Sequence, residues 1–319
     1  MSGMNGNTAH GRGTIPLYFI LGPSYHGAPV LARELNAHPS ILCLGTGNPA
    51  KGEETPCSCG APVSACPFWT KVAQGLNELG DDDGEFYRHY LPRHPVITAR
   101  EGLDVWIAGA LSLLANEAGP KAWKFFYEQA ERFLKKHETF HAIARTEAPH
   151  KFFVDAERSN IKFMVMASMG FPVGGVIHLV RDPRGYAASM KKYYPESSAE
   201  KLAMEWAAEH TRIGRLRSFF PKIPFLTLRQ EELAADMDGS LQEIAAFMGL
   251  PEKQGFAAGA EASPLKNHQI GAAPQEQGED AALTVLDWRE SLHPEDQARV
   301  MKAAGPLFSD FGYKSEILP

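Results

Sequence analysis

The residues with the clearest chemical meaning lie between two short elements near the N-terminus. Residues 17–21 are apolar and predict a strand, residues 30–35 suit a helix, and glycines stand at 22 and 27 between them. A strand, a glycine-containing loop and a helix in this order predict backbone N–H groups that point at an anion such as a phosphate. The residues of the predicted anion loop are Ser24, Tyr25, His26, Gly27, Ala28 and Pro29.

The anion loop lacks the side chains that hydrolysis of a nucleoside triphosphate requires. Such enzymes place a lysine and then a serine or threonine after the second glycine, to neutralise phosphate and to hold Mg²⁺. Here these two positions are Ala28 and Pro29. We therefore expect an anion site that does not hydrolyse ATP.

A second candidate anion site follows the apolar stretch at residues 175–180. Arg181 ends this predicted strand, Asp182 and Pro183 suit the start of a helix, and Ser189 lies two turns further on. Ligands of open parallel sheets bind where strands end and helices begin, so Arg181 and Ser189 are predicted to bind one anion. The alternative is structural, with Arg181 bonded to a carbonyl group or to Asp182.

Three of the four cysteines, Cys57, Cys59 and Cys66, lie close together in the sequence. In a chain expected to be cytosolic, such a cluster favours a metal site over a disulfide. The spacing matches no familiar zinc pattern, and a fourth ligand would have to come from Cys43 or a distant histidine. A metal site and a thiol loop braced by glycine and proline both stay open; we adopt the second and assign no metal ligand.

Strands and helices alternate around these residues. Continuous apolar runs, typical of strands that are buried on both faces, begin near residue 15 and recur at residues 41–44, 151–154, 175–180 and 224–228. A helix is predicted between the last two runs, over residues 199–217, with its apolar residues close to one face. This alternation predicts an α/β fold with three layers, in which helices flank a parallel sheet.

We expect one domain over residues 15–319, preceded by a disordered lead-in over residues 1–14 that is rich in glycine and asparagine. Within the domain, residues 45–67 are dense in glycine, proline and cysteine and predict a loop excursion. Residues 69–148 predict an aromatic-rich helical insertion, which could build an acceptor pocket over the anion site.

Composition excludes several classes of function. The net charge is −6 and the basic residues are scattered, which argues against nucleic acid or an anionic membrane surface as a partner. The longest apolar run, residues 105–115, is too short to cross a bilayer, and the N-terminus lacks the apolar core of a signal peptide. A cytoplasmic location is therefore expected, and the oligomeric state is left open.

Four separated segments resemble the bacterial branch of the sulfotransferases that use 3′-phosphoadenosine 5′-phosphosulfate (PAPS). They are residues 22–31 with 36–39, residues 57–69, residues 176–190, and residues 288–292 with 311–313. The resemblance implies a P-loop-like sulfotransferase fold and transfer of a sulfuryl group to a hydroxyl or amine of a small-molecule or peptide acceptor. It also implies that the reaction requires no metal.

The same resemblance implies roles for individual residues. Arg181 and Ser189 would bind the 3′-phosphate of the donor, and the main chain from Ser24 to Pro29 would bind its 5′-phosphosulfate. Arg289 is a further candidate for contact with the nucleotide, whereas the adjacent Trp288 is expected to pack in the interior.

The anion loop also departs from the pattern of these enzymes. Where they carry a lysine or arginine followed by hydroxyl residues, this chain has Tyr25 to Pro29. Negative charge develops on the leaving nucleotide during transfer, and Tyr25 cannot supply the cation that would stabilise it. His26 can do so when it is protonated, although a structural histidine is the alternative.

The usual acceptor base is also missing, since residues 44–47 contain no glutamate. Asp155, at the end of a predicted strand, is the best substitute, although it could instead cap a helix. An alternative function therefore stays open, in which the fold no longer handles the sulfuryl donor and is either non-catalytic or chemically repurposed.

Overall fold

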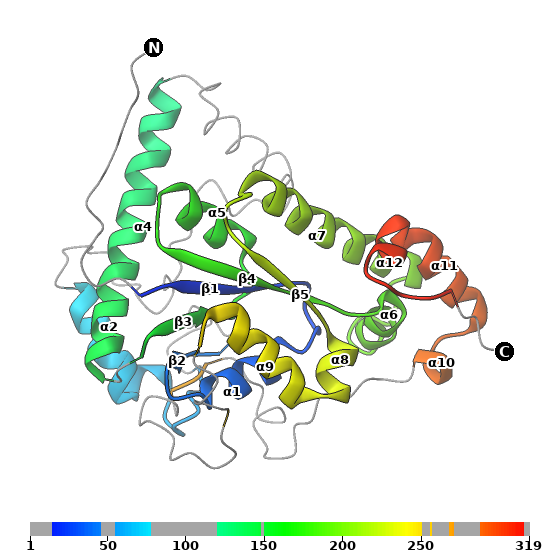
Figure 1. The fold of residues 1–319 in the computed structure, drawn as a ribbon, viewed down its shortest axis with the longest axis horizontal. Helices are drawn as coiled ribbons and strands as arrows, with labels where there is room; N and C mark the ends of the chain where they lie inside the picture. Colours follow the sequence, from blue (N-terminus) through cyan, green and yellow to red (C-terminus); the bar gives the residue numbers. More distant parts are fainter. Residues whose placement is uncertain are drawn as a thin grey trace.

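The computed structural model describes residues 15–45, 55–77, 120–147, 150–250, 256, 268–270 and 288–315, with the backbone alone for 120–133. Five parallel strands form one sheet in the order β2-β3-β1-β4-β5. The strands are β1 (Leu17–Leu21), β2 (Ile41–Leu42), β3 (Phe152–Asp155), β4 (Val173–Val180) and β5 (Phe225–Arg229). Helices cover both faces of this sheet, so the predicted three-layer α/β fold is confirmed (Figure 1).

Helices of very different lengths connect these strands and follow the last of them. They are α1 (Ala28–Asn36), the 3-10 helix η2 (Val63–Ala65), α2 (Pro67–Asn77), α4 (Pro120–Glu147), α5 (Asn160–Ser168), α6 (Pro183–Lys191), α7 (Ala199–Phe219), α8 (Gln230–Ala235), α9 (Met237–Met248), α10 (Trp288–Ser291), α11 (Pro294–Ala304) and α12 (Pro306–Asp310). Among the helices described, none combines the length and the apolar character needed to cross a membrane.

The central strand β1 shows why the predicted strands read as unbroken apolar runs. Its five residues are all buried, and alternate side chains enter different cores because successive residues point to opposite faces. Leu17, Phe19 and Leu21 pack with residues of α2, α4 and α5, whereas Tyr18 and Ile20 pack with residues of α1 and α9. Neither face is available to water, and the one polar side-chain group of this strand, the Tyr18 hydroxyl, donates a hydrogen bond to the carbonyl oxygen of Met248 at 3.5 Å.

A third core lies beyond the end of β4, where α6, α7 and the C-terminal helices meet (Figure 1). Leu202 and Trp206 of α7 belong to it, together with Trp288 and Phe308. The predicted apolar face of α7 is therefore buried, with Ile213 and Leu216 entering the first core. This arrangement fixes α6, whose N-terminus carries the second candidate anion site.

The predicted boundaries differ from the observed ones by a few residues. Helix α1 begins at Ala28, so that Ala28 and Pro29 belong to its first turn and not to the loop. The described parts of the predicted insertion, α2 and α4, are helical, whereas residues 78–119 and the predicted lead-in at 1–14 lie outside the described residues. The division into a single domain stays a prediction.

Candidate active site

The anion loop leaves β1 along the edge of the neighbouring strand. At Gly22, whose φ is 155°, a Cβ atom would lie 2.6 Å from the carbonyl oxygen of Leu179, so only glycine fits this close approach. Tyr25 and Gly27 take left-handed backbone conformations, with φ of 63° and 85°, and turn the chain into α1. The first amides of α1 have no intrahelical partner and favour an anion, although Pro29 itself carries no amide hydrogen.

Arg181 lies against this loop with only 3% of its surface exposed. Its Nη1 donates a hydrogen bond to the carbonyl oxygen of Tyr25 at 2.8 Å. Its Nη2 is buried and has no hydrogen-bond partner among the described residues. A buried guanidinium N–H group without a partner is costly, and an anionic ligand would satisfy it.

Asp182 forms its ion pair with Arg184. Its carboxylate receives Nε of Arg184 at 3.0 Å and Nη2 of Arg184 at 2.7 Å, and it also caps α6 by accepting the Arg184 amide. The predicted start of α6 at Asp182 and Pro183 is therefore confirmed. Arg184 therefore takes the hydrogen bonds of the Asp182 carboxylate, while the negative charges of Glu231 and Asp182 still act on the buried guanidinium of Arg181.

Gly185 makes room for Arg181. A Cβ atom at this position would lie 3.2 Å from Nε of Arg181 and 3.6 Å from the ring of Trp288. Trp288 is buried, and the guanidinium groups of Arg184 and Arg289 lie over its ring, 3.7 and 4.4 Å from the ring centroid. The structure thus places Arg289 on the exposed side of this stack and Ser189 further along α6, largely buried.

Arg158 is a residue of this site that the sequence analysis missed. It follows β3 in a left-handed conformation, with φ of 62°, and its Nη1 donates to the carbonyl oxygen of Pro23 at 3.3 Å. β3 and β4, the two neighbours of β1 in the sheet, are therefore each followed by an arginine that donates a hydrogen bond to the loop. These arginines are Arg158 after β3 and Arg181 after β4. No sequence signal could have found Arg158, because nothing distinguishes an arginine three residues after a strand that contacts a distant loop from one that is exposed.

His26 belongs to the anion loop, and it is buried, with 1% of its surface exposed. Its Nδ1 donates to the carbonyl oxygen of Ser24 at 2.9 Å, and its ring neighbours are Tyr186 and His210. The pKa of His26 is lowered to about 3, mainly by burial and also by the positive charges of Arg181 and Arg158, against the opposing effect of the hydrogen bond to Ser24. Without a ligand, His26 is therefore neutral, with its proton on Nδ1 and a lone pair on Nε2.

Asp155 is part of a buried network of charges at the end of β3. Lys162 forms ion pairs with Asp155 and, at 3.3 Å, with Glu157, and the three side chains are between 2% and 7% exposed. The Asp155 carboxylate also accepts the amide of Glu157 at 3.0 Å. It does not cap the following helix, because α5 is capped by Ser159.

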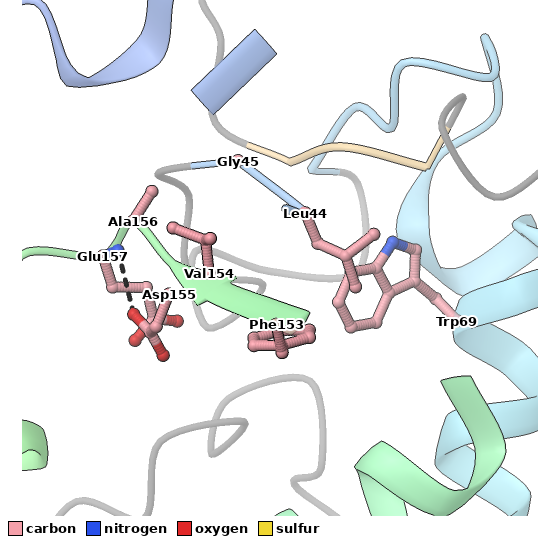
Figure 2. A pocket seen from close by; sticks show the side chains of 8 residues that line it. All are labelled: Leu44, Gly45, Trp69, Phe153, Val154, Asp155, Ala156 and Glu157. Carbon is pink, nitrogen blue, oxygen red and sulfur yellow. Dashed lines mark hydrogen bonds between the residues drawn. The ribbon is translucent and has the colours of Figure 1, made fainter. Parts of the chain in front are cut away.

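Glu157 is the second residue that the sequence analysis missed. Burial raises its pKa to about 7, and the nearby Asp155 carboxylate acts in the same direction against the opposing effect of Lys162. Figure 2 shows the carboxyl groups of Asp155 and Glu157 side by side in a pocket that Leu44, Gly45 and Trp69 also line. A carboxyl group whose pKa lies near 7 is well suited to accept a proton from a substrate.

A comparison with protein families identifies the chain. Residues 82–254, more than half of its length, match the model of the sulfotransferase family. The chain belongs to the sulfotransferase family. The matched range contains Asp155, Arg158 and Arg181, whereas the anion loop and Arg289 lie outside it.

The solved structure of one sulfotransferase domain shares the fold. The sulfotransferase domain of the Synechococcus PCC 7002 olefin synthase is 19% identical, covers 97% of this chain and 98% of its own, and superposes with a TM-score of 0.50. The sulfotransferase domain of the curacin biosynthetic pathway is 14% identical, with coverages of 96% and 99% and a TM-score of 0.48. A sulfotransferase from Mycobacterium avium is 12% identical, with coverages of 94% and 77% and a TM-score of 0.46. No curated protein matches the chain.

Proposed function

We propose that this sulfotransferase transfers a sulfuryl group from PAPS to a hydroxyl or amine of a small-molecule or peptide acceptor. The observation that carries the proposal is the buried guanidinium of Arg181, which contacts the anion loop and keeps one N–H group without a partner among the described residues. Membership of the family and a parallel sheet with an anion loop at its carboxyl edge support the same conclusion.

In this proposal the donor spans two anion sites. The amides of the segment from Ser24 to Ala28 bind the 5′-phosphosulfate, with Pro29 fixing the first turn of α1. Arg181 and Ser189 bind the 3′-phosphate, and Arg289 contacts the nucleotide from the exposed side of Trp288. No metal takes part in the transfer.

The transfer itself requires a cation and a base. The acceptor oxygen or nitrogen attacks sulfur, the bond from sulfur to the bridging oxygen breaks, and 3′-phosphoadenosine 5′-phosphate (PAP) leaves with the electron pair. We assign the neutralisation of PAP to Arg158 and His26, which lie at the loop. We assign the role of base to Glu157, which accepts the proton of the acceptor. Asp155 beside it forms an ion pair with Lys162.

Replacing Arg181 with alanine tests the proposal directly. Wild-type protein is expected to bind PAP in a calorimetric titration, and Arg181→Ala should weaken this binding by about a hundredfold, because charged hydrogen bonds to phosphate are lost. Arg299→Ala on α11 removes the same charge from a surface ion pair and should bind PAP like the wild type. Absence of PAP binding by the wild type would contradict the proposal. Binding of PAP without consumption of PAPS would favour the non-catalytic alternative.

Binding of the donor is also expected to change the protonation of His26. A phosphosulfate or phosphate in the loop raises the pKa of His26 from about 3 and opposes the effects of burial, Arg181, Arg158 and His178, while the ring of His210 packs beside it. We expect this rise to bring the pKa of His26 into the neutral range in the complex, so that the bound protein takes up a proton and PAP affinity falls as the pH rises from 6 to 8. Calorimetry of PAP binding in two buffers of different ionisation enthalpy measures this uptake.

The matched variants for this measurement are His26→Asn and Glu157→Gln. The first should abolish the proton uptake by the protein, so that the remaining proton exchange comes from the ligand phosphates, which release protons when they bind beside arginines. The second removes the other group whose pKa lies within reach of neutral pH and should leave the uptake by His26 intact. Equal uptake by wild type and His26→Asn would show that His26 stays neutral in the complex.

A further inference from the structure

Four side chains that could bind a metal come together away from the anion loop. They are Cys57, Cys59, Cys66 and His268, and their ligand atoms all lie within 4.8 Å of one another. Two of the cysteines are buried and Cys59 is exposed, and none of the three is in a disulfide. The sequence could not pair them with His268, which lies some two hundred residues further along the chain.

The distances fit a tetrahedral site. Around zinc, bonds of about 2.3 Å to sulfur and 2.0–2.1 Å to nitrogen place two sulfurs about 3.8 Å apart and a sulfur about 3.5 Å from a nitrogen. In the structure the sulfurs of Cys57 and Cys66 are 3.7 Å apart. The Nδ1 atom of His268 lies 3.7 Å from the first and 3.1 Å from the second. A disulfide would instead need its sulfurs about 2.05 Å apart and would leave His268 unexplained.

Backbone amides beside the sulfurs oppose the effect of burial, which raises the pKa of the Cys57 and Cys66 thiols. The amide of Cys59 donates to the sulfur of Cys57, the amide of Ala61 to Cys59, and the amides of Phe68 and Trp69 to Cys66. Amide hydrogen bonds of this kind stabilise the charged form of a sulfur ligand and fix its direction. The turn that brings Cys57 and Cys59 together closes at Gly60, whose φ is 89°.

His268 is also held in place by its neighbours. Its carbonyl oxygen accepts a hydrogen bond from Nε1 of Trp69 at 3.2 Å, and the ring of Phe68 stacks on its imidazole. The next two residues pair with the cysteine loop, through hydrogen bonds between Gln269 and Ser58 and a bridge between Ile270 and Cys57. A metal here would fasten residues 268–270 to the start of α2.

We propose that Cys57, Cys59, Cys66 and His268 bind one zinc ion in a structural Cys₃His site. All four positions are taken by protein ligands, as in structural rather than catalytic zinc sites. The exposed thiol of Cys59 gives the ion a route of entry. Because Trp69 contacts both His268 and the pocket that contains Asp155 and Glu157, the zinc holds one wall of this pocket without taking part in the transfer.

Metal analysis of the full chain tests the site. Protein purified without chelator and under reducing conditions is expected to contain one zinc ion per chain, as measured by inductively coupled plasma mass spectrometry. Cys59→Ser changes an exposed side chain and should lose most of this zinc, whereas Cys43→Ser, at a buried cysteine outside the cluster, should keep it. Removal of zinc from the wild type should lower the melting midpoint by roughly 5–10 °C, and added Zn²⁺ should restore it.

A spectroscopic measurement on the wild type avoids any loss of folding in the variants. Co²⁺ added to the zinc-free protein should give the intense sulfur-to-cobalt charge-transfer bands of a tetrahedral thiolate site. Reduced, zinc-free wild type that fails to bind Zn²⁺ or Co²⁺ would overturn the assignment, and so would an unchanged zinc content in Cys59→Ser.

Discussion

Lys162→Met is expected to lower the free energy of unfolding by about 3–5 kcal/mol at pH 8, because it leaves two buried carboxylates without their cation. Asp155 and Glu157 both pair with Lys162, whose amine is almost completely buried. Methionine keeps the apolar stem of the lysine and removes only its charge. Urea unfolding at pH 8 and at pH 5.5 measures the effect.

Lys162→Met should lower the free energy of unfolding less at pH 5.5 than at pH 8, because Glu157 can be protonated at the lower pH. Its pKa is about 7 in the folded protein, above its value of 4.5 in the unfolded chain, so the folded state binds more protons between these values and stability falls as the pH rises through them. Without Lys162 the pKa of Glu157 rises further, since Lys162 is the charge that lowers it. Protonation can then relieve the buried carboxylates at low pH but not at high pH.

Lys71→Met is the matched control for this experiment. Lys71 forms an ion pair with Glu147 at 2.7 Å, but the lysine side chain is 56% exposed. Water screens such a pair, so its loss should cost less than about 1 kcal/mol at either pH. If Lys162→Met proved no more destabilising than Lys71→Met, the buried network would be unimportant for stability.

Arg158→Met is expected to lower the turnover of PAPS by about 100- to 1000-fold and to weaken PAP binding by no more than about tenfold. Arg158 reaches the anion loop from the end of β3, and the loop carries no lysine or arginine of its own. A cation near the leaving group acts mainly in the transition state, where its charge is developing. The measurement is PAP release from PAPS in the presence of simple phenols, alcohols and amines.

Arg158→Lys is the informative companion because it restores the charge without the forked guanidinium. It should recover part of the lost turnover, since lysine acts as a point charge towards phosphate. Arg299→Met on α11 removes an exposed arginine and should leave turnover unchanged. Normal turnover in Arg158→Met would exclude Arg158 as the cation of the loop. Melting curves of the variants separate this effect from unfolding.

Much of the fold was predictable because local pattern and tertiary environment agree. Continuous apolar runs marked the strands at residues 151–154, 175–180 and 224–228, and each has its counterpart in β3, β4 or β5. The start of α6 was equally clear, because Asp182 and Pro183 have strong local preferences for the first positions of a helix. The start of α1 was placed two residues too late, since helix ends depend on weak local signals.

The sequence by itself determined the parallel sheet, the glycine-containing loop after β1 and the position of Arg181, because these depend on apolar runs, glycines and caps within short segments. Only the tertiary structure decided which charged side chains come together at the loop and at the end of β3. Arg158 and the pair of Glu157 with Lys162 reach their places through the turns that follow β3. His268 joins the three cysteines across some two hundred residues. Such contacts depend on how distant segments pack, which no local preference of the chain expresses.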